Sequence, residues 1–107
     1  MLLSVVVPVF NERETVEEVF RGLRESLERA RIPSEIIVVD DASTDGTSVV
    51  LARLSEARII RHGENRGYGA ALKTGVRASR GNILGIIDAD GTYPVDEFPR
   101  LLQALTV

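Results

Sequence analysis

Cysteine is missing from the 107 residues, and histidine occurs only once, at position 62. The absence of cysteine excludes a disulfide scaffold and every zinc site built on thiolates. The single histidine excludes metal sites that need several imidazole ligands. The chain also has no apolar run close to the ~20 residues that a helix needs to cross a bilayer.

Neither positively nor negatively charged residues are in large excess. The 16 acidic and 13 basic residues give a formal net charge of −3, which offers no general attraction to nucleic-acid phosphates. The rest of the composition, 44% hydrophobic and 27% charged, is that of an ordinary globular protein and argues against disorder. From the length we expect residues 1–107 to form a single domain with one core and room for one ligand.

Four short runs rich in valine and isoleucine are the first positive signal. They are continuous rather than alternating, which is typical of strands that are buried on both faces of a parallel sheet. The runs occupy residues 3–8, 35–40, 58–61 and 82–87.

Helical patterns separate these runs. After the first run, apolar residues recur with helical spacing at Val16, Val19, Phe20, Leu23 and Leu27. Ahead of them, Asn11 and Glu14 have the spacing of a capping box. A second helix is expected to begin near Ser43 or Thr44 and a third to span about 67–79, with Gly81 supplying a positive φ after its end. A fourth is expected at about 95–105.

This alternation of strands and helices predicts an α/β fold. Each connection between strands is long enough for a crossover helix, so the strands are expected to be parallel. The expected architecture is an open, doubly wound sheet of about four strands with helices on both faces. Such a sheet has two free edges, through which the chain could form a homodimer.

Acidic residues follow three of the predicted strands. In a parallel sheet the carboxyl ends of the strands lie along one rim, where ligands bind. Five carboxylates should therefore gather there: Glu12, Asp40, Asp41, Asp88 and Asp90. Their repulsion is costly unless cations or hydrogen-bond donors intervene. Two carboxylates one residue apart suit Mg²⁺ or Mn²⁺, and that ion would in turn hold a diphosphate.

Several polar residues have simpler interpretations. Asn11 can serve as a helix cap, and Asp45–Gly46 as a turn. His62 and Tyr93 are expected to be partly exposed loop residues without a role. The glycine-rich segment 65–69 opens a helix and could meet a phosphate, but it lacks the spacing of a P-loop or a dinucleotide fingerprint.

Four segments, in this order and spacing, resemble glycosyltransferase family 2. The similarity is greatest to the branch of dolichol-phosphate mannosyltransferases and polyprenyl-phosphate glycosyltransferases. The segments are VPVFNE at 7–12, VDDASTDGT at 39–47, NRGYGAA at 65–71 and DADGTYP at 88–94. The resemblance implies a GT-A fold that binds a nucleotide-sugar donor at the carboxyl rim of the sheet.

The resemblance also implies a set of donor-binding residues. Pro8, Phe10 and Glu12 would line the nucleoside pocket. Val39 and Asp41 would close that pocket, with Asp41 on the base or the ribose.

The segment Asp88–Ala89–Asp90 matches the Asp-X-Asp motif of the family. By this resemblance Asp90 would hold a Mg²⁺ or Mn²⁺ ion on the diphosphate, and Asp88 would contact the ribose or the metal. Asp88 and Asp90 are therefore the expected catalytic and metal-binding residues. Arg66 would approach the diphosphate.

The implied reaction transfers a hexose with inversion from a donor of the GDP-mannose or UDP-glucose type. The acceptor would be a polyprenyl or dolichyl phosphate, which is already anionic and needs little or no general base. Thr92 stands where relatives often have glutamine, which leaves the sugar open. Catalytic domains of the family are longer, so this chain is expected to be the N-terminal, donor-binding half. It should be soluble and cytoplasmic, whereas full-length relatives would act at the cytoplasmic face of a membrane.

Three alternatives compete with this interpretation. Asp88 and Asp90 also resemble the first motif of haloacid-dehalogenase-type phosphatases, in which they would be nucleophile and acid/base around Mg²⁺. Asp40–Asp41 is similar to the acidic pair of response-regulator receivers, but those need a lysine at a later strand end. The only lysine, Lys73, falls inside a predicted helix. A third alternative is a module that binds nucleotide and metal without catalysis.

Overall fold

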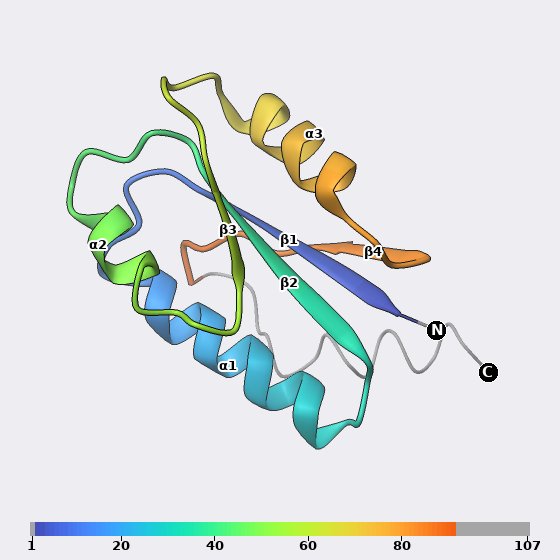
Figure 1. Cartoon of the computed structure of the whole chain (residues 1–107). Coiled ribbons are helices and arrows are strands. Elements are labelled where there is room, and N and C mark those ends of the chain that lie inside the picture. The colour runs from blue at the N-terminus through green and yellow to red at the C-terminus, as the bar shows by residue number, and fades with distance from the viewer. Residues whose placement is uncertain (1, 92–107) are drawn as a thin grey trace.

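The computed structural model describes residues 2–91 and shows a four-stranded parallel sheet with helices on both faces (Figure 1). The strands lie in the order β3-β2-β1-β4. The elements follow one another as β1 (Leu3–Val9), α1 (Val16–Arg29), β2 (Ser34–Asp40), α2 (Thr47–Leu51), β3 (Arg58–Arg61), α3 (Tyr68–Ala78) and β4 (Ile83–Ile86). The predicted α/β class, the parallel strands and the doubly wound arrangement are confirmed.

The two faces of the sheet are covered by different helices. On one face, alternate residues of β1 pack with the apolar stripe of α1, and Leu51 of α2 joins the same core. On the other face, Val6, Ile37 and Val39 pack under Ala71 of α3. Figure 1 shows this separation, with α1 and α2 on one side of the strands and α3 on the other. Among residues 2–91, no helix is both long and apolar enough to span a membrane.

The edge strands differ from the prediction. β1 is buried along its whole length, and β2 is buried from Ile36 onward, but alternate residues of β3 and β4 are exposed. Ile59, Leu84 and Ile86 are the exposed apolar residues of these two strands. Burial on both faces is therefore wrong for β3 and β4, because they are the edge strands and the helices pack mainly on β1 and β2.

Helix boundaries differ as well. α1 begins at Val16 with Thr15 as its N-cap residue, so the predicted cap by Asn11 is wrong. Asn11 has a positive φ of 53°, and its amide oxygen accepts a 2.8 Å hydrogen bond from the backbone N–H of Thr44. α2 begins at Thr47 with Gly46 as its N-cap residue, later than predicted. Asp45 accepts from the Thr47 N–H at 3.0 Å, as a turn-forming aspartate does.

Gly81, after α3, has a different role from the one predicted. The helix ends at Ala78, and Ser79 is already extended. Gly81 is not among the residues with positive φ. Glycine is needed at this position because a Cβ atom would lie 2.5 Å from the carbonyl oxygen of Leu2. The fourth predicted helix, at 95–105, lies outside the described residues, as do Thr92 and Tyr93.

The carboxyl ends of neighbouring strands are held level with one another by backbone hydrogen bonds. The Asp41 N–H donates to the Val9 carbonyl at 2.9 Å, and the His62 N–H donates to the Asp40 carbonyl at 2.9 Å. The Ile87 N–H donates to the Val6 carbonyl at 3.1 Å. The loops that follow the strands therefore start side by side along one edge of the sheet.

Candidate functional site

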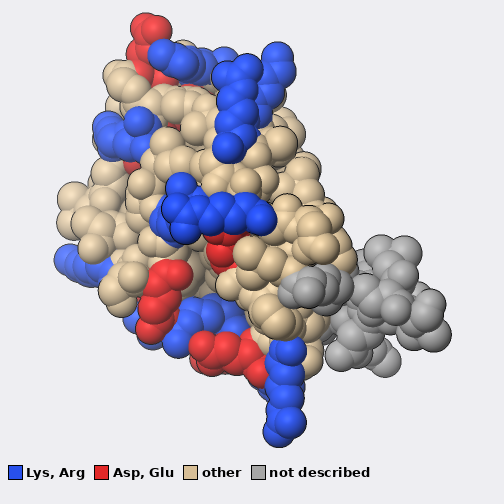
Figure 2. Space-filling model, turned by 45° about the vertical axis from the view of Figure 1, so that its right-hand side comes forward, with Lys and Arg blue, Asp and Glu red and all other residues tan. Residues whose placement is uncertain are grey.

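A cavity of about 490 Å³ opens at this carboxyl edge. Its walls come from four places in the chain: the segment after β1, the end of β2, the start of α3 with the loop before it, and the loop after β4. The lining residues are Pro8, Val9, Phe10, Glu12, Asp41, Asn65, Gly67, Tyr68, Ala71, Asp88, Ala89 and Asp90. On the face of the molecule in Figure 2, acidic and basic side chains are interspersed rather than gathered into a field of one sign.

Most of the residues expected at the site do line this cavity. Seven of them are brought together there: Pro8, Phe10, Glu12, Asp41, Asp88, Ala89 and Asp90. Val39 and Arg66 are not among the described lining residues. Val39 is fully buried behind the cavity, in the core under α3. Arg66 contributes its backbone, since its N–H donates to Asp41 at 2.9 Å.

The loop after β4 presents two carboxylates. Asp88 and Asp90 are exposed, whereas Ala89 between them is buried. The hydroxyl of Thr15 donates to the carbonyl of Ala89 at 2.6 Å and so ties this loop to the start of α1. The alternation leaves the two acidic side chains on the accessible side of the loop.

Tyr68, in the first turn of α3, reaches across to the same loop. Its hydroxyl donates to Oδ1 of Asp88 at 2.9 Å. This hydrogen bond, then burial and the negative charges of Asp88 and Asp90, raise the pKa of the Tyr68 phenol above its usual value. The phenol therefore stays a neutral donor at physiological pH.

The chemistry of the donor set fits a hard divalent cation. Carboxylate oxygens are the protein ligands that Mg²⁺ prefers, and it usually takes only one or two of them together with phosphate oxygens and water. Residues 2–91 contain no group of three or more His, Cys, Asp or Glu side chains placed to enclose a metal. Asp88 and Asp90 could thus hold a cation that a phosphate-bearing ligand shares.

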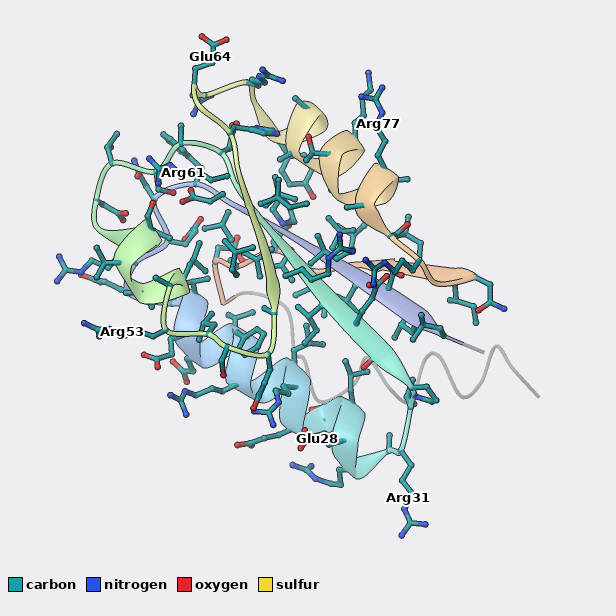
Figure 3. All side chains as sticks on the ribbon, viewed as in Figure 1. Glu28, Arg31, Arg53, Arg61, Glu64 and Arg77 are labelled. Carbon is teal, nitrogen blue, oxygen red and sulfur yellow. The ribbon has the colours of Figure 1, made fainter. Side chains whose placement is uncertain are left out.

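Asp40 does not belong to this acidic group. It is 1% exposed and is not among the cavity-lining residues. Its carboxylate accepts from the Ser43 N–H at 3.0 Å and the Ser48 hydroxyl at 2.7 Å, and it pairs with Arg61 at 3.1 Å. Figure 3 shows Arg61 beside α2. Of the five carboxylates expected to gather at this rim, Asp40 is therefore turned away from the cavity and joins β2 to α2 and β3.

Asp41 lines the cavity, and its carboxylate also accepts three hydrogen bonds from the protein. Its Oδ1 accepts from Nδ1 of His62 at 2.8 Å and from the Arg66 N–H at 2.9 Å, and its Oδ2 accepts from the Gly67 N–H at 2.8 Å. Burial alone would raise the pKa of Asp41, but these three donors outweigh it and lower the pKa below its usual value. Asp41 is therefore ionised at neutral pH.

The prediction for His62 is wrong, because His62 is 7% exposed and hydrogen-bonded and is not a partly exposed loop residue. In the glycine-rich segment the N–H groups of Arg66 and Gly67 bind Asp41, while Asn65, Gly67 and Tyr68 line the cavity. Contact of this segment with a phosphate stays a prediction. Five lining residues were not among the expected site residues: Val9, Asn65, Gly67, Tyr68 and Ala71. The segment 65–71 belongs to one of the motifs, and its position before and within α3 is the available signal.

Comparisons with known proteins agree with this geometry. The family model for glycosyl transferase family 2 matches residues 4–107. A dolichol-phosphate mannosyltransferase from Pyrococcus furiosus is 33% identical, with 98% of this chain and 30% of the relative covered. An undecaprenyl-phosphate 4-deoxy-4-formamido-L-arabinose transferase from Sodalis glossinidius is 35% identical, with 94% and 32% covered. The chain thus spans about a third of the length of these relatives.

Solved structures give the same result. The mannosyltransferase PcManGT from Pyrobaculum calidifontis, in complex with GDP-Man and Mn²⁺, superposes with a TM-score of 0.79 at 30% identity, over 98% of this chain and 32% of that one. TarS 1–349 from S. aureus, in complex with UDP-GlcNAc, has a TM-score of 0.74 at 27% identity, over 97% and 30%. These similarities confirm the expected GT-A architecture. With a family match over nearly its whole length, the chain belongs to glycosyltransferase family 2.

Proposed function

We propose that this chain is the donor-binding unit of an inverting glycosyltransferase. It takes a hexose from a nucleoside diphosphate sugar of the GDP-mannose or UDP-glucose type and passes it to a polyprenyl or dolichyl phosphate. The observation that carries the proposal is the single cavity shared by Asp41 and the Asp88–Asp90 loop. The names of the relatives, a dolichol-phosphate and an undecaprenyl-phosphate transferase, support the class of acceptor.

The nucleoside is assigned to the side of the cavity formed by the ends of β1 and β2. Phe10 lines this side and is 45% exposed, so its ring offers an apolar surface to a base. Asp41 supplies a fixed acceptor for an N–H of the base, and Glu12 an acceptor for a ribose hydroxyl. Val39 supports this wall from the core behind it.

The diphosphate is assigned to the side formed by the loop after β4. Asp88 and Asp90 would hold Mg²⁺ or Mn²⁺, in keeping with the Mn²⁺ present with GDP-Man in PcManGT. Such an ion stabilises the negative charge that develops on the departing nucleoside diphosphate. Arg66, on the loop before α3, is proposed to approach the same phosphates.

The acceptor explains why the cavity needs no basic catalyst. A phosphate oxygen of the acceptor would form the new bond to the anomeric carbon while the bond from that carbon to the donor phosphate breaks. Because the attacking oxygen is already ionised, no proton has to be removed.

The alternative is binding of nucleotide and metal without transfer, which would use the same residues. The phosphatase hypothesis has less support, because the one lysine of the chain, Lys73, is exposed on α3 and is not among the described lining residues. Receiver-type chemistry needs the same lysine and an exposed Asp40, and Asp40 is buried.

Calorimetry with GDP and UDP, each with Mn²⁺ and with a chelator, tests the proposal. We expect one nucleotide to bind with metal dependence. Asp88→Asn and Asp90→Asn should each weaken binding in Mn²⁺ by about tenfold or more, the scale of a lost charged contact. Glu64→Gln is the matched control, because Glu64 is exposed and points away from the molecule (Figure 3). Absence of binding by the folded chain, or equal binding by all variants, would contradict the proposal.

Assays of product separate transfer from binding alone. The bound donor is incubated with a short-chain polyprenyl phosphate, and the glycosylated lipid and free hexose are measured. Lipid product supports the transferase, whereas binding without product supports the alternative function.

A further inference from the structure

The one histidine of the chain is buried behind the cavity. His62 directly follows β3, and its ring lies between Asp41 and Thr74 of α3. Nδ1 is 2.8 Å from Oδ1 of Asp41, and Nε2 is 2.7 Å from the Thr74 hydroxyl. His62 is not among the described lining residues, so it can affect a ligand in the cavity only through another group.

The partners decide which ring nitrogen carries a proton. An ionised carboxylate can only accept hydrogen bonds, so Nδ1 must donate to Asp41. In the neutral ring Nε2 is then an acceptor, and the Thr74 hydroxyl donates to it. Thr74 thus fixes the tautomer that Asp41 requires. Both ring nitrogens are satisfied, which holds the imidazole in one orientation.

Counting hydrogen-bond acceptor positions shows how much of the Asp41 carboxylate is left for a ligand. A carboxylate has about four acceptor positions on its two oxygens. His62 and the Arg66 N–H occupy two on Oδ1, and the Gly67 N–H occupies one on Oδ2. One position on Oδ2 is left for a ligand, and Asp41 lines the cavity.

We propose that His62 is a positioning residue that, braced by Thr74, turns Asp41 so that its last acceptor position faces the nucleobase. This inference rests on the proposed function, since it takes a nucleotide as the ligand. Without the imidazole, the two backbone donors would still bind the carboxylate but would not fill Oδ1, and the side chain could rotate about their axis.

The arrangement has a consequence for base selection. Because Asp41 only accepts, the base must present an N–H to it. Uracil N3 and guanine N1 carry a proton, whereas cytosine N3 and adenine N1 do not. Cytosine and adenine have a donor only on the neighbouring exocyclic amino group, so these bases must shift in the cavity to reach Asp41, at a cost in affinity. The discrimination of UDP over CDP, or of GDP over ADP, therefore reports how firmly Asp41 is held.

Two variants of His62 separate its two contacts. In His62→Asn the amide nitrogen stands near the place of Nδ1 and can still donate to Asp41, while the contact with Thr74 is lost. In His62→Gln the amide stands near the place of Nε2 and keeps the contact with Thr74, while Asp41 loses its donor. The two side chains carry the same amide group. If His62 acted only through packing or stability, His62→Gln would therefore not bind nucleotide more weakly than His62→Asn.

The experiment measures the dissociation constants of the preferred nucleotide and of its mismatched partner, in Mn²⁺, for both variants. We expect His62→Asn to stay within about threefold of the wild type and His62→Gln to lose about tenfold for the preferred nucleotide, as a lost charged hydrogen bond would give. The base discrimination ratio should fall in His62→Gln only. Inorganic pyrophosphate with Mn²⁺ should bind all forms equally, because it does not reach Asp41. Circular dichroism and thermal melts establish that each variant is folded.

Equal losses in both variants, or an unchanged discrimination ratio in His62→Gln, would overturn the positioning role. If the His62 variants do not fold, Thr74→Val provides the test. It removes the hydroxyl that fixes the ring. Unlike the amide nitrogen of His62→Asn, which always carries protons, the freed imidazole can turn or carry its proton on Nε2, so the discrimination ratio should fall although Asp41 itself is unchanged. An unchanged ratio would again overturn the proposal. A folded wild type that binds no nucleotide would overturn the proposed function and this inference together. Nucleotide binding with equal losses overturns the positioning role alone.

Discussion

The phenol of Tyr68 and the carboxylate of Asp88 are joined by a 2.9 Å hydrogen bond that links α3 to the loop after β4. Since Asp88 is a proposed metal ligand, Tyr68 would orient that ligand. We predict that Tyr68→Phe weakens binding of Mn²⁺ in the presence of nucleotide. Removing a residue that hydrogen-bonds to a metal ligand typically lowers the metal affinity by about 10–100-fold. Because water can replace the exposed phenol, we expect a loss of about tenfold or less here. Titration of Mn²⁺ followed by electron paramagnetic resonance measures this.

The same variant has an internal control. The phenyl ring that remains after the substitution would keep its contacts in the cavity, so binding of nucleotide in chelator should not change. A loss of equal size with metal and with chelator would mean that Tyr68 contacts the nucleotide instead of orienting Asp88.

Asp40 and Asp41 are adjacent in sequence but should respond differently to the same substitution. Asp40→Asn removes the charge of a buried carboxylate that pairs with the half-exposed Arg61, and should cost about 1–3 kcal/mol of folding free energy. The affinity for nucleotide should be retained in the molecules that are folded. Asp41→Asn should weaken nucleotide binding about tenfold, because the amide presents a donor where an acceptor is needed. Urea unfolding and calorimetry on both variants provide the two readouts.

This pair also shows what the sequence could predict about the site. The order of strands and acids along the chain was enough to place Asp41, Asp88 and Asp90 at one edge. Successive residues of a strand point to opposite faces, so Asp40 and Asp41 could not both face one ligand. That alternation was visible in the sequence, and it assigns Asp40 to the side of α2 and Asp41 to the side of α3.

The remaining misses arise from contacts between distant residues. Valine- and isoleucine-rich runs predicted all four strands, because β-branched residues favour an extended backbone in edge strands as well as in buried ones. The local cap at Asn11 failed because its amide binds Thr44 instead, 33 residues away. His62 could not be recognised for the same reason, since its partners lie 21 and 12 residues away. A lone histidine in the sequence carries no sign of such partners.

Glu35 should make the stability depend on pH. Its Oε2 accepts from the Ser4 hydroxyl and from the Arg80 N–H, each at 2.6 Å, and Arg58 lies 3.5 Å from Oε1. Burial alone would raise the pKa of Glu35, but these contacts outweigh it and lower the pKa from 4.5. A carboxylate whose pKa is lower in the folded than in the unfolded state stabilises the fold at pH values above its unfolded-state pKa. This stabilisation is lost as the pH falls through its folded-state pKa.

Glu35→Gln tests that contribution. The amide keeps an acceptor oxygen but does not titrate. We expect wild type to be more stable than the variant at pH 6, and the difference to shrink as pH falls from about 4.5 towards 3. Asp41 titrates in both proteins and cancels in the comparison. Urea unfolding at several pH values gives the difference, and a gap that stays constant with pH would show that ionised Glu35 does not stabilise the fold.

Gly75 sets how closely α3 packs on the sheet. A Cβ atom at this position would overlap the methyl groups of Val6 in β1, so glycine is needed for the approach. Gly75→Ala should therefore destabilise the fold by about 1–3 kcal/mol, despite the higher helix propensity of alanine. Gly69→Ala is the matched control in the same helix, because nothing lies within 4 Å of its Cβ position. That substitution should be neutral or stabilise by up to about 1 kcal/mol.

A double-mutant cycle decides whether Val6 is the cause. Val6→Ala alone removes two methyl groups from the core and should destabilise the fold. Combined with Gly75→Ala, the new Cβ occupies the space that those methyl groups leave. The double variant should therefore lose less stability than the sum of the two single losses, as expected for residues in direct contact. Additive losses would show that the strain in Gly75→Ala falls elsewhere, and that the spacing between α3 and β1 is not set by this contact.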